Sequence, residues 1–141
     1  MSNPYQLLGG EAGVRALCEA FYDIMNSDPD IADIRRMHGG DLGPITEKLY
    51  EYLSGWMGGP PLYQIKHGSM CMSGPHRPYA IGPKERDQWL LCMERALERV
   101  NAGDEVRTLL REPLRRIAGA VQNRDHSDAT SSAATTAAAA V

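Results

Sequence analysis

A loop and a helix meet in the stretch Pro75-His76-Arg77-Pro78-Tyr79-Ala80-Ile81-Gly82-Pro83-Lys84-Glu85-Arg86-Asp87-Gln88-Trp89-Leu90-Leu91-Cys92-Met93. Its first half is rich in proline and glycine, which is typical of a stiff loop. Pro83 then stands at a position that the first turn of a helix favours. Apolar residues recur at helical spacing from Trp89 to Val100. This stretch therefore predicts a loop followed by one long helix over residues 83–100.

Three more helical segments precede this loop. Apolar positions at steps of three and four predict a helix over Glu11–Met25. A short segment over Asp30–Met37 stops at a glycine pair. A strongly amphipathic helix is predicted over Leu42–Met57, and it ends at Gly58-Gly59-Pro60.

The stretch Pro61–Gly82 shows neither a helical nor a strand period, so it predicts a long loop with at most one helical turn. A loop of about 20 residues is uncommon inside a compact domain unless it is functional. We therefore expect the functional site in this loop or beside it.

The C-terminal part of the chain predicts one more helix, over Asp104–Val121, in which Pro113 should produce a kink or a split. Beyond Asn123 the chain consists mainly of Ser, Thr and Ala, which favours a disordered tail over residues 124–141. No run alternates at period two for long enough to predict a strand. The sequence thus predicts an all-α domain over residues 1–123 with about four substantial helices.

Size and charge exclude several classes of function. The chain has 141 residues, 43% of them hydrophobic, which fits one globular domain. Fifteen basic and eighteen acidic side chains give a net charge of −3, which disfavours nucleic acid as a partner. No apolar run approaches the roughly 20 residues that cross a bilayer, and the N-terminus lacks a secretion signal. We expect a cytoplasmic protein with no membrane partner.

Common catalytic and metal-binding motifs are missing from the sequence. There is no histidine pair at helical spacing, no Cys-x-x-Cys, no Cys-x-x-Cys-His for covalent haem and no glycine-rich phosphate loop. His76 in the predicted loop is then the side chain that stands out. On composition alone, a surface histidine is the simpler interpretation of it.

The order of motifs along the chain resembles that of the group II truncated haemoglobins. The stretch from Pro75 to Met93 is similar to their proximal loop and the helix after it. Phe21-Tyr22 resembles a pair in their second helix, while Gly9-Gly10 and Leu53–Pro60 resemble their two glycine motifs. The resemblance runs from about Tyr5 to Asn123. It implies a globin-like, truncated two-over-two helical sandwich around haem b, and the predicted helices agree with that fold.

The resemblance also implies roles for four residues around the haem iron. His76 is similar to the proximal histidine that ligates the iron. On the opposite side, Tyr22 and Trp89 resemble donors of hydrogen bonds to a bound ligand. His38 is a third candidate donor, and its proton would make ligand binding sensitive to pH. Core packing remains the alternative for Tyr22 and Trp89, and an exposed hinge histidine is the alternative for His38.

Further residues are implied as contacts of the haem itself. Lys48 and Arg77 are candidates to pair with the propionates, and Tyr63 is a candidate to hydrogen-bond them, although a lysine or arginine is more often solvated surface. Ile45 takes the place of the usual distal gate residue, where an aliphatic side chain cannot donate a hydrogen bond. The complete set of implied haem contacts is His76, Ile45, Lys48, Leu49, Tyr63, Arg77, Tyr79, Ile81 and Met93.

The function implied is that of a haem protein that binds dioxygen, carbon monoxide and nitric oxide, as a monomer or a homodimer. Dioxygen held by several donors is released slowly, which suits redox chemistry better than delivery. Such chemistry would be conversion of nitric oxide to nitrate or a peroxidase-like reaction, and it would need an unknown reductase. An oxygen carrier or sensor stays open. So does a helical interaction module without haem, regulated by Cys71.

Overall fold

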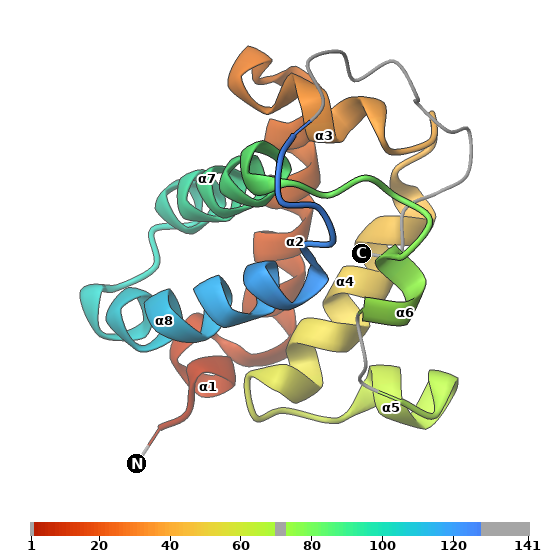
Figure 1. Cartoon of the computed structure of the whole chain (residues 1–141). Helices are drawn as coiled ribbons and strands as arrows, with labels where there is room; N and C mark the ends of the chain where they lie inside the picture. Colours follow the sequence, from red (N-terminus) through yellow and green to blue (C-terminus); the bar gives the residue numbers. More distant parts are fainter. Residues whose placement is uncertain (1, 70–72, 128–141) are drawn as a thin grey trace.

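The computed structural model describes residues 2–69 and 73–127, and within them every regular element is a helix (Figure 1). The elements in chain order are α1 (Pro4–Leu8), α2 (Gly10–Ser27), the 3-10 turn η1 (Pro29–Ile31), α3 (Ala32–Arg36), α4 (Gly43–Trp56), α5 (Leu62–His67), α6 (Ser73–His76), α7 (Pro83–Arg99) and α8 (Asp104–Val121). The predicted all-α class is confirmed. None of the helices in these residues is both long and apolar enough to span a bilayer.

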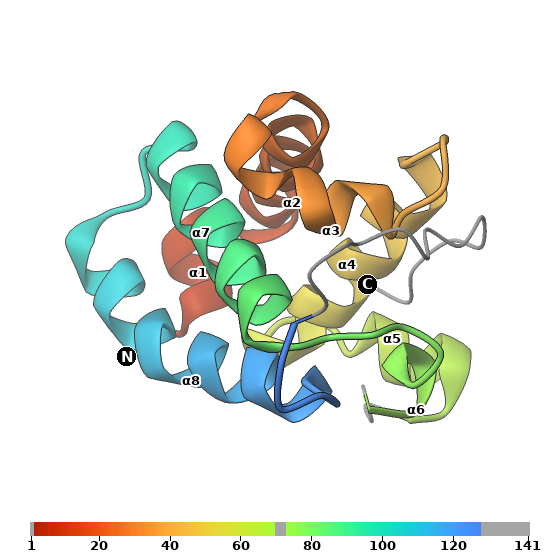
Figure 2. The same cartoon turned by 45° about the horizontal axis from the view of Figure 1, so that its top comes forward.

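Four long helices form two contacting pairs. α2 packs against α4, α7 packs against α8, and the two pairs meet where α2 crosses α7 (Figures 1 and 2). This is the two-over-two arrangement that the sequence predicted. All four helices contribute large buried side chains to one core, among them Leu17, Phe21, Met25, Leu49, Leu53, Met93 and Leu110. Burial of each such side chain stabilises the fold by about 1.5 to 3 kcal/mol.

The starts of the helices follow from local chemistry. Proline occupies the first turn of α1, α4 and α7, where its missing N–H leaves no hydrogen bond unmade. The Asn3 side chain caps α1 by accepting from the Gln6 N–H at 2.9 Å. Glu85 supplies one half of a capping box at α7, where its carboxylate accepts from the Gly82 N–H at 2.8 Å and glycine offers no side chain in return.

One prediction about local structure is wrong, and of the kink or split expected at Pro113 the split is absent. The stretch Pro61–Gly82 holds two short helices, α5 and α6, instead of at most one turn. α5 is held by tertiary contacts, because the Tyr63 ring packs edge-on against Tyr52 of α4 at 5.6 Å, and periodicity over six residues cannot reveal this. α8 is not split at Pro113. The carbonyl that loses its donor belongs to Leu109, a residue that is 47% exposed and that water can reach.

The tail predicted from residue 124 onwards is only partly described. Residues 124–127 run back along the beginning of α7, and Ser127 contacts Glu85 there. The rest of the predicted tail, 128–141, lies outside the described residues.

The corner between α1 and α2 explains the first glycine motif. Gly9 ends α1 with φ of 105°, a left-handed conformation that favours glycine. The turn brings α2 back so closely that a Cβ on Gly13 would lie 1.7 Å from the Leu8 carbonyl oxygen. α1 is fixed at its other end to the second glycine motif, where the Asn3 amide donates to the Gly58 carbonyl at 3.1 Å.

The substitution Gly13→Ala tests this close approach. Alanine favours a helix by about 1 kcal/mol over glycine, but the backbone of α1 would have to move, so we expect a net loss of about 1 to 3 kcal/mol of unfolding free energy. Gly119→Ala is the matched control, because Gly119 is also helical and a Cβ there meets nothing within 4 Å. That variant should be neutral or slightly more stable. Urea unfolding measures both, and equal effects of the two substitutions would contradict the packing argument.

Candidate functional site

An apolar cavity opens between the two helix pairs, with about 730 Å³ of empty space including its mouth. The side chains around it come from α3, α4, the loop after α6, α7 and α8, and they are Ile34, Met37, His38, Leu49, Tyr52, Leu53, His76, Tyr79, Ile81, Glu85, Arg86, Trp89, Ile117, Ala118 and Val121. Six of these residues were predicted: His38, Leu49, His76, Tyr79, Ile81 and Trp89.

His76 is the last residue of α6 and is buried at the cavity wall. The chain turns directly after it, and the Tyr79 N–H donates to the His76 carbonyl at 3.0 Å. Tyr79 and Ile81 are also buried and pack with Met37 and Val121. The loop therefore presents an imidazole and two apolar side chains to the same cavity, and the interpretation of His76 as a surface histidine is wrong.

His38 stands on the α3 side of the cavity. The Arg35 guanidinium holds the turn after α3 by donating to the Gly39 carbonyl at 3.0 Å. His38 Nδ1 lies 2.7 Å from the Ile34 carbonyl oxygen. Since a carbonyl oxygen only accepts, Nδ1 carries the proton in the neutral ring and Nε2 carries a lone pair. His38 then becomes a donor toward the cavity only when its ring is protonated.

Burial controls the charge of this imidazole. His38 Nε2 is buried and makes no hydrogen bond within the described residues. Loss of hydration lowers the pKa of His38 from its ordinary value of 6.5, although the hydrogen bond to Ile34 acts in the opposite direction. The neutral ring, with its acceptor at Nε2, is therefore the form favoured at neutral pH.

Tyr22 brings a second buried polar group close to His38. Its ring packs at 5.9 Å from the His38 ring, yet Tyr22 is not itself part of the cavity wall. The Tyr22 hydroxyl is buried without a hydrogen-bond partner among the described residues. Burial raises the pKa of Tyr22, so the hydroxyl keeps its proton and remains a donor. An unpaired buried hydroxyl costs free energy, and such costs concentrate at functional sites.

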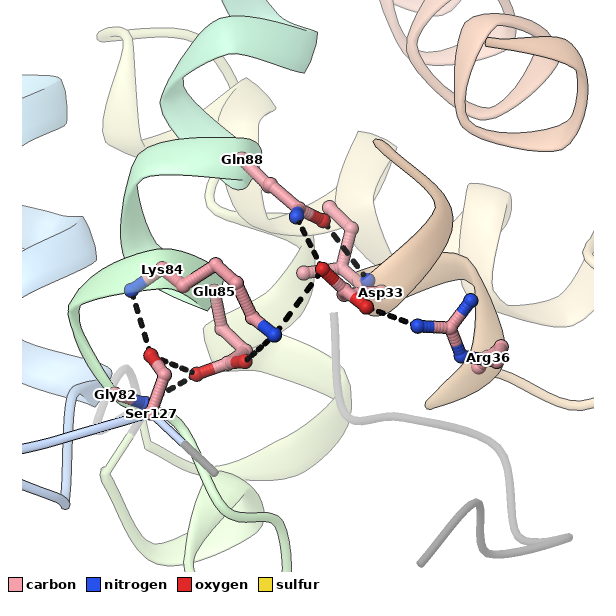
Figure 3. A network of polar contacts seen from close by, with 8 residues as sticks. Asp33, Arg36, Gly82, Lys84, Glu85, Gln88 and Ser127 are labelled. Atoms are coloured by element: carbon pink, nitrogen blue, oxygen red, sulfur yellow. Dashed lines mark hydrogen bonds and ion pairs between the residues drawn. The ribbon is translucent and has the colours of Figure 1, made fainter. Parts of the chain in front are cut away.

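Trp89 lines the cavity from α7, and its ring packs 5.6 Å from Phe21. The preceding residue, Gln88, joins α7 to α3: its amide donates to Asp33 at 2.7 Å, and its carbonyl oxygen accepts from the Ile34 N–H at 3.2 Å (Figure 3). Lys84 adds an ion pair with Asp33 at 3.3 Å. These links hold the helix that leads into His38 against the helix that carries Trp89.

Six predicted contacts lie away from the cavity wall. Tyr22, Ile45 and Met93 are buried in the core, with Ile45 and Met93 at 2% and 1% exposure. Lys48 and Arg77 are not among the lining residues, and Arg77 is exposed. Tyr63 faces α4 instead, where its ring stands between Tyr52 and His67.

Sequence reasoning missed the contribution of α8 and of the first turn of α7. Ile117, Ala118 and Val121 lie on the apolar face that predicted α8, but periodicity does not tell which apolar residues face a cavity. Arg86 lines the cavity while its guanidinium donates to Gln122 at 2.9 Å and pairs with Asp87 at 3.0 Å. A basic residue in the first turn of a helix gives no signal of such a position.

The family model described as Bacterial-like globin matches residues 3–123. The chain belongs to this family. Among curated proteins, it is 33% identical to the group 2 truncated haemoglobin of Bacillus subtilis over 76% of this chain and 78% of that one.

Solved structures place it within group II of the truncated haemoglobins. The group II two-on-two haemoglobin of Agrobacterium tumefaciens is 39% identical, with a TM-score of 0.84 over 89% of this chain and 97% of that one. The cold-adapted truncated haemoglobin of Pseudoalteromonas haloplanktis is 36% identical, with a TM-score of 0.84 over 87% and 99%. Binding of diatomic ligands through haem follows from membership of the family.

The lowered pKa of His38 predicts how the stability of this truncated haemoglobin depends on pH. In the unfolded chain His38 takes up a proton near 6.5, whereas in the folded protein it does so only at lower pH. Its contribution is therefore fully present above pH 6.5 and is lost as the pH falls. His38→Gln replaces the titrating imidazole with a side chain that takes up no proton. The unfolding free energy of the variant should therefore fall less than that of the parent between about pH 7 and pH 5. Urea unfolding at both pH values checks this, and equal losses in the two proteins would contradict it.

Proposed function

We propose that the protein binds haem b in the apolar cavity, with a ring nitrogen of His76 as the iron ligand and a diatomic gas held on the His38 side. The haem, when bound, supplies an iron centre that coordinates the gas and exchanges electrons with it. The observation that carries this proposal is a buried imidazole on an apolar cavity with two buried polar groups nearby, Tyr22 Oη and His38 Nε2, that have no hydrogen-bond partner in residues 2–69 and 73–127.

The wall of the cavity fits a flat apolar macrocycle with one charged edge. Leu49, Tyr79 and Ile81 offer apolar contact, and Arg86 offers a cation at the beginning of α7. We propose Arg86 as a partner of the propionates, beside Lys48 and Arg77. Arg77 is exposed, and its contribution to propionate binding would be small. Ile45 and Met93 would support the haem from the core.

Three side chains control a ligand held near the iron. Tyr22 donates from its protonated hydroxyl, and Trp89 offers its indole N–H from α7. His38 accepts a proton or a hydrogen bond at Nε2 while neutral, and it donates after protonation. Ligand release should therefore slow as the pH falls through the lowered pKa of His38.

We propose slow release of dioxygen coupled to redox turnover as the function. Oxidation of nitric oxide balances as nitric oxide plus dioxygen plus one electron giving nitrate, so a separate reductase must deliver one electron per turnover. A related haemoglobin of Bacillus subtilis, 30% identical, is described as oxygen-avid, which supports tight retention here. A peroxidase-like reaction would use the same donors. The proposed setting is the cytoplasm, with the protein as a monomer or a homodimer.

His76→Ala tests the iron ligand. The variant should lose haem during purification or show a changed visible spectrum. Among the described residues that line the cavity, the other imidazole is His38, which lies on the α3 side. His126→Ala, at an exposed histidine, serves as the control and should keep the spectrum of the parent. Spectra are recorded as isolated, after dithionite and after carbon monoxide. A colourless parent protein that takes up no hemin would instead support an interaction module without haem. Cys71, the residue proposed to regulate such a module, lies outside the described residues.

Tyr22→Phe tests the distal donor. It keeps the ring that packs against Phe21 at 4.9 Å and removes only the hydroxyl. One hydrogen bond in a dry pocket is worth about 1 to 3 kcal/mol, so dioxygen release should be about 5- to 150-fold faster. Tyr50→Phe, in a tyrosine that packs under Arg15, is the control and should leave the rate unchanged. Stopped-flow measurement of release decides the role: slow release by the parent supports redox chemistry, and fast release supports oxygen delivery or sensing.

A further inference from the structure

The loop that carries His76 lies beside the chain that leaves α8. Residues 76–82, called here the proximal loop, run to the start of α7, and residues 122–127 lie alongside them in both views (Figures 1 and 2). The two segments are more than 40 positions apart in sequence, and one residue, Asn123, makes most of the hydrogen bonds between them.

The side-chain amide of Asn123 uses both its donor and its acceptor groups on the proximal loop. Its Oδ1 accepts from the Ile81 N–H at 2.9 Å. Its Nδ2 donates to the Tyr79 carbonyl at 2.8 Å and to the His76 carbonyl at 3.2 Å. The backbone N–H of Asn123 adds a bond to the Ile81 carbonyl at 2.8 Å. Four hydrogen bonds from one residue thus hold three residues of the loop.

Only an amide side chain of this length meets all of these groups. An aspartate could still accept from the Ile81 N–H, but it has no donor for the two carbonyls and would place a negative charge beside them. A leucine of similar shape would lose all three side-chain hydrogen bonds to the loop. The chemistry of the contact is therefore specific to Asn123 and not a matter of filled volume.

A second contact fixes the far end of the same segment. Ser127 Oγ accepts from the Lys84 N–H at 2.8 Å and donates to Glu85 at 2.9 Å (Figure 3). Between the two contacts the chain passes so close to Gly82 that a Cβ there would lie 2.7 Å from the His126 carbonyl oxygen. The segment is held at both ends, so Asn123 has a fixed position from which to hold the loop.

We propose that Asn123 is a positioning residue for His76: by binding the carbonyl of His76 and both sides of Ile81, it sets the direction in which the imidazole meets the haem iron. This proposal rests on the proposed function, in which His76 is the iron ligand. The constraint reaches the ring through the backbone of His76. A carbonyl that is held in place restricts this backbone and therefore the direction of the Cα–Cβ bond. Asn123 itself does not touch the ligand or the iron.

The test compares Asn123→Asp with the parent in the full-length protein carrying haem. The iron–histidine stretching band of the ferrous protein without gas, measured by resonance Raman, should shift or broaden in the variant. Hemin transfer to an excess of apomyoglobin should be faster, on the order of tenfold, since two hydrogen bonds are lost. Asn101→Asp introduces the same charge at an exposed turn residue and should change neither quantity.

Hydrogen exchange gives a readout that does not depend on the haem. The Ile81 amide should be protected in the parent and exchange faster in Asn123→Leu, which removes the acceptor of this N–H, and rapid exchange in the parent would refute the contact itself. If Asn123→Asp does not fold, Ser127→Ala releases the other end of the segment and should shift the Raman band by a smaller amount. An unchanged band in the variant that folds, even with a lower melting temperature, would overturn the positioning role. Absence of any iron–histidine band in the parent would instead refute the proposed function.

Discussion

The crossing of α2 over α7 is the contact on which the rest of the molecule depends. Phe21 is fully buried there, and its ring touches Tyr22 on its own helix and Trp89 on the other. The Cys92 thiol adds a hydrogen bond to the Phe21 carbonyl at 3.1 Å. Because both proposed donors sit next to this one side chain, the hydrophobic core and the ligand side of the cavity are built by the same contact.

The cavity combines features that a packed core normally avoids. Protein interiors are close-packed, and buried polar groups nearly always have partners. Here the structure keeps an apolar cavity with about 730 Å³ of empty space including its mouth, and among the described residues Tyr22 Oη and His38 Nε2 have no hydrogen-bond partner. Both features lower stability in the isolated chain, and both would be compensated in the proposed complex, where haem fills the space and a polar ligand meets the two atoms. The links between α3 and α7 through Gln88 keep the opposite walls in place.

Periodicity was sufficient for the long helices and insufficient for what lies between them. The predicted segments Glu11–Met25 and Leu42–Met57 correspond to α2 and α4 within a few residues, because an apolar stripe at 3.6-residue spacing is a property of the helix alone. α5 and the path of residues 124–127 depend on partners far along the chain, and no local pattern encodes those partners. His76 was found through the motif around it. Asn123 was named only as the end of the domain, since a single amide becomes significant only when the three groups that it meets are known.

The hydrogen bonds of Asn123 and Ser127 change where this globin domain ends. Helix α8 stops at Val121, and a boundary drawn there from secondary structure would keep every long helix and almost the whole apolar core. Such a shortened chain would lack the segment that holds the proximal loop. Expression boundaries, fusion junctions and circular permutations of this protein therefore belong after Ser127, at a point that no helix marks.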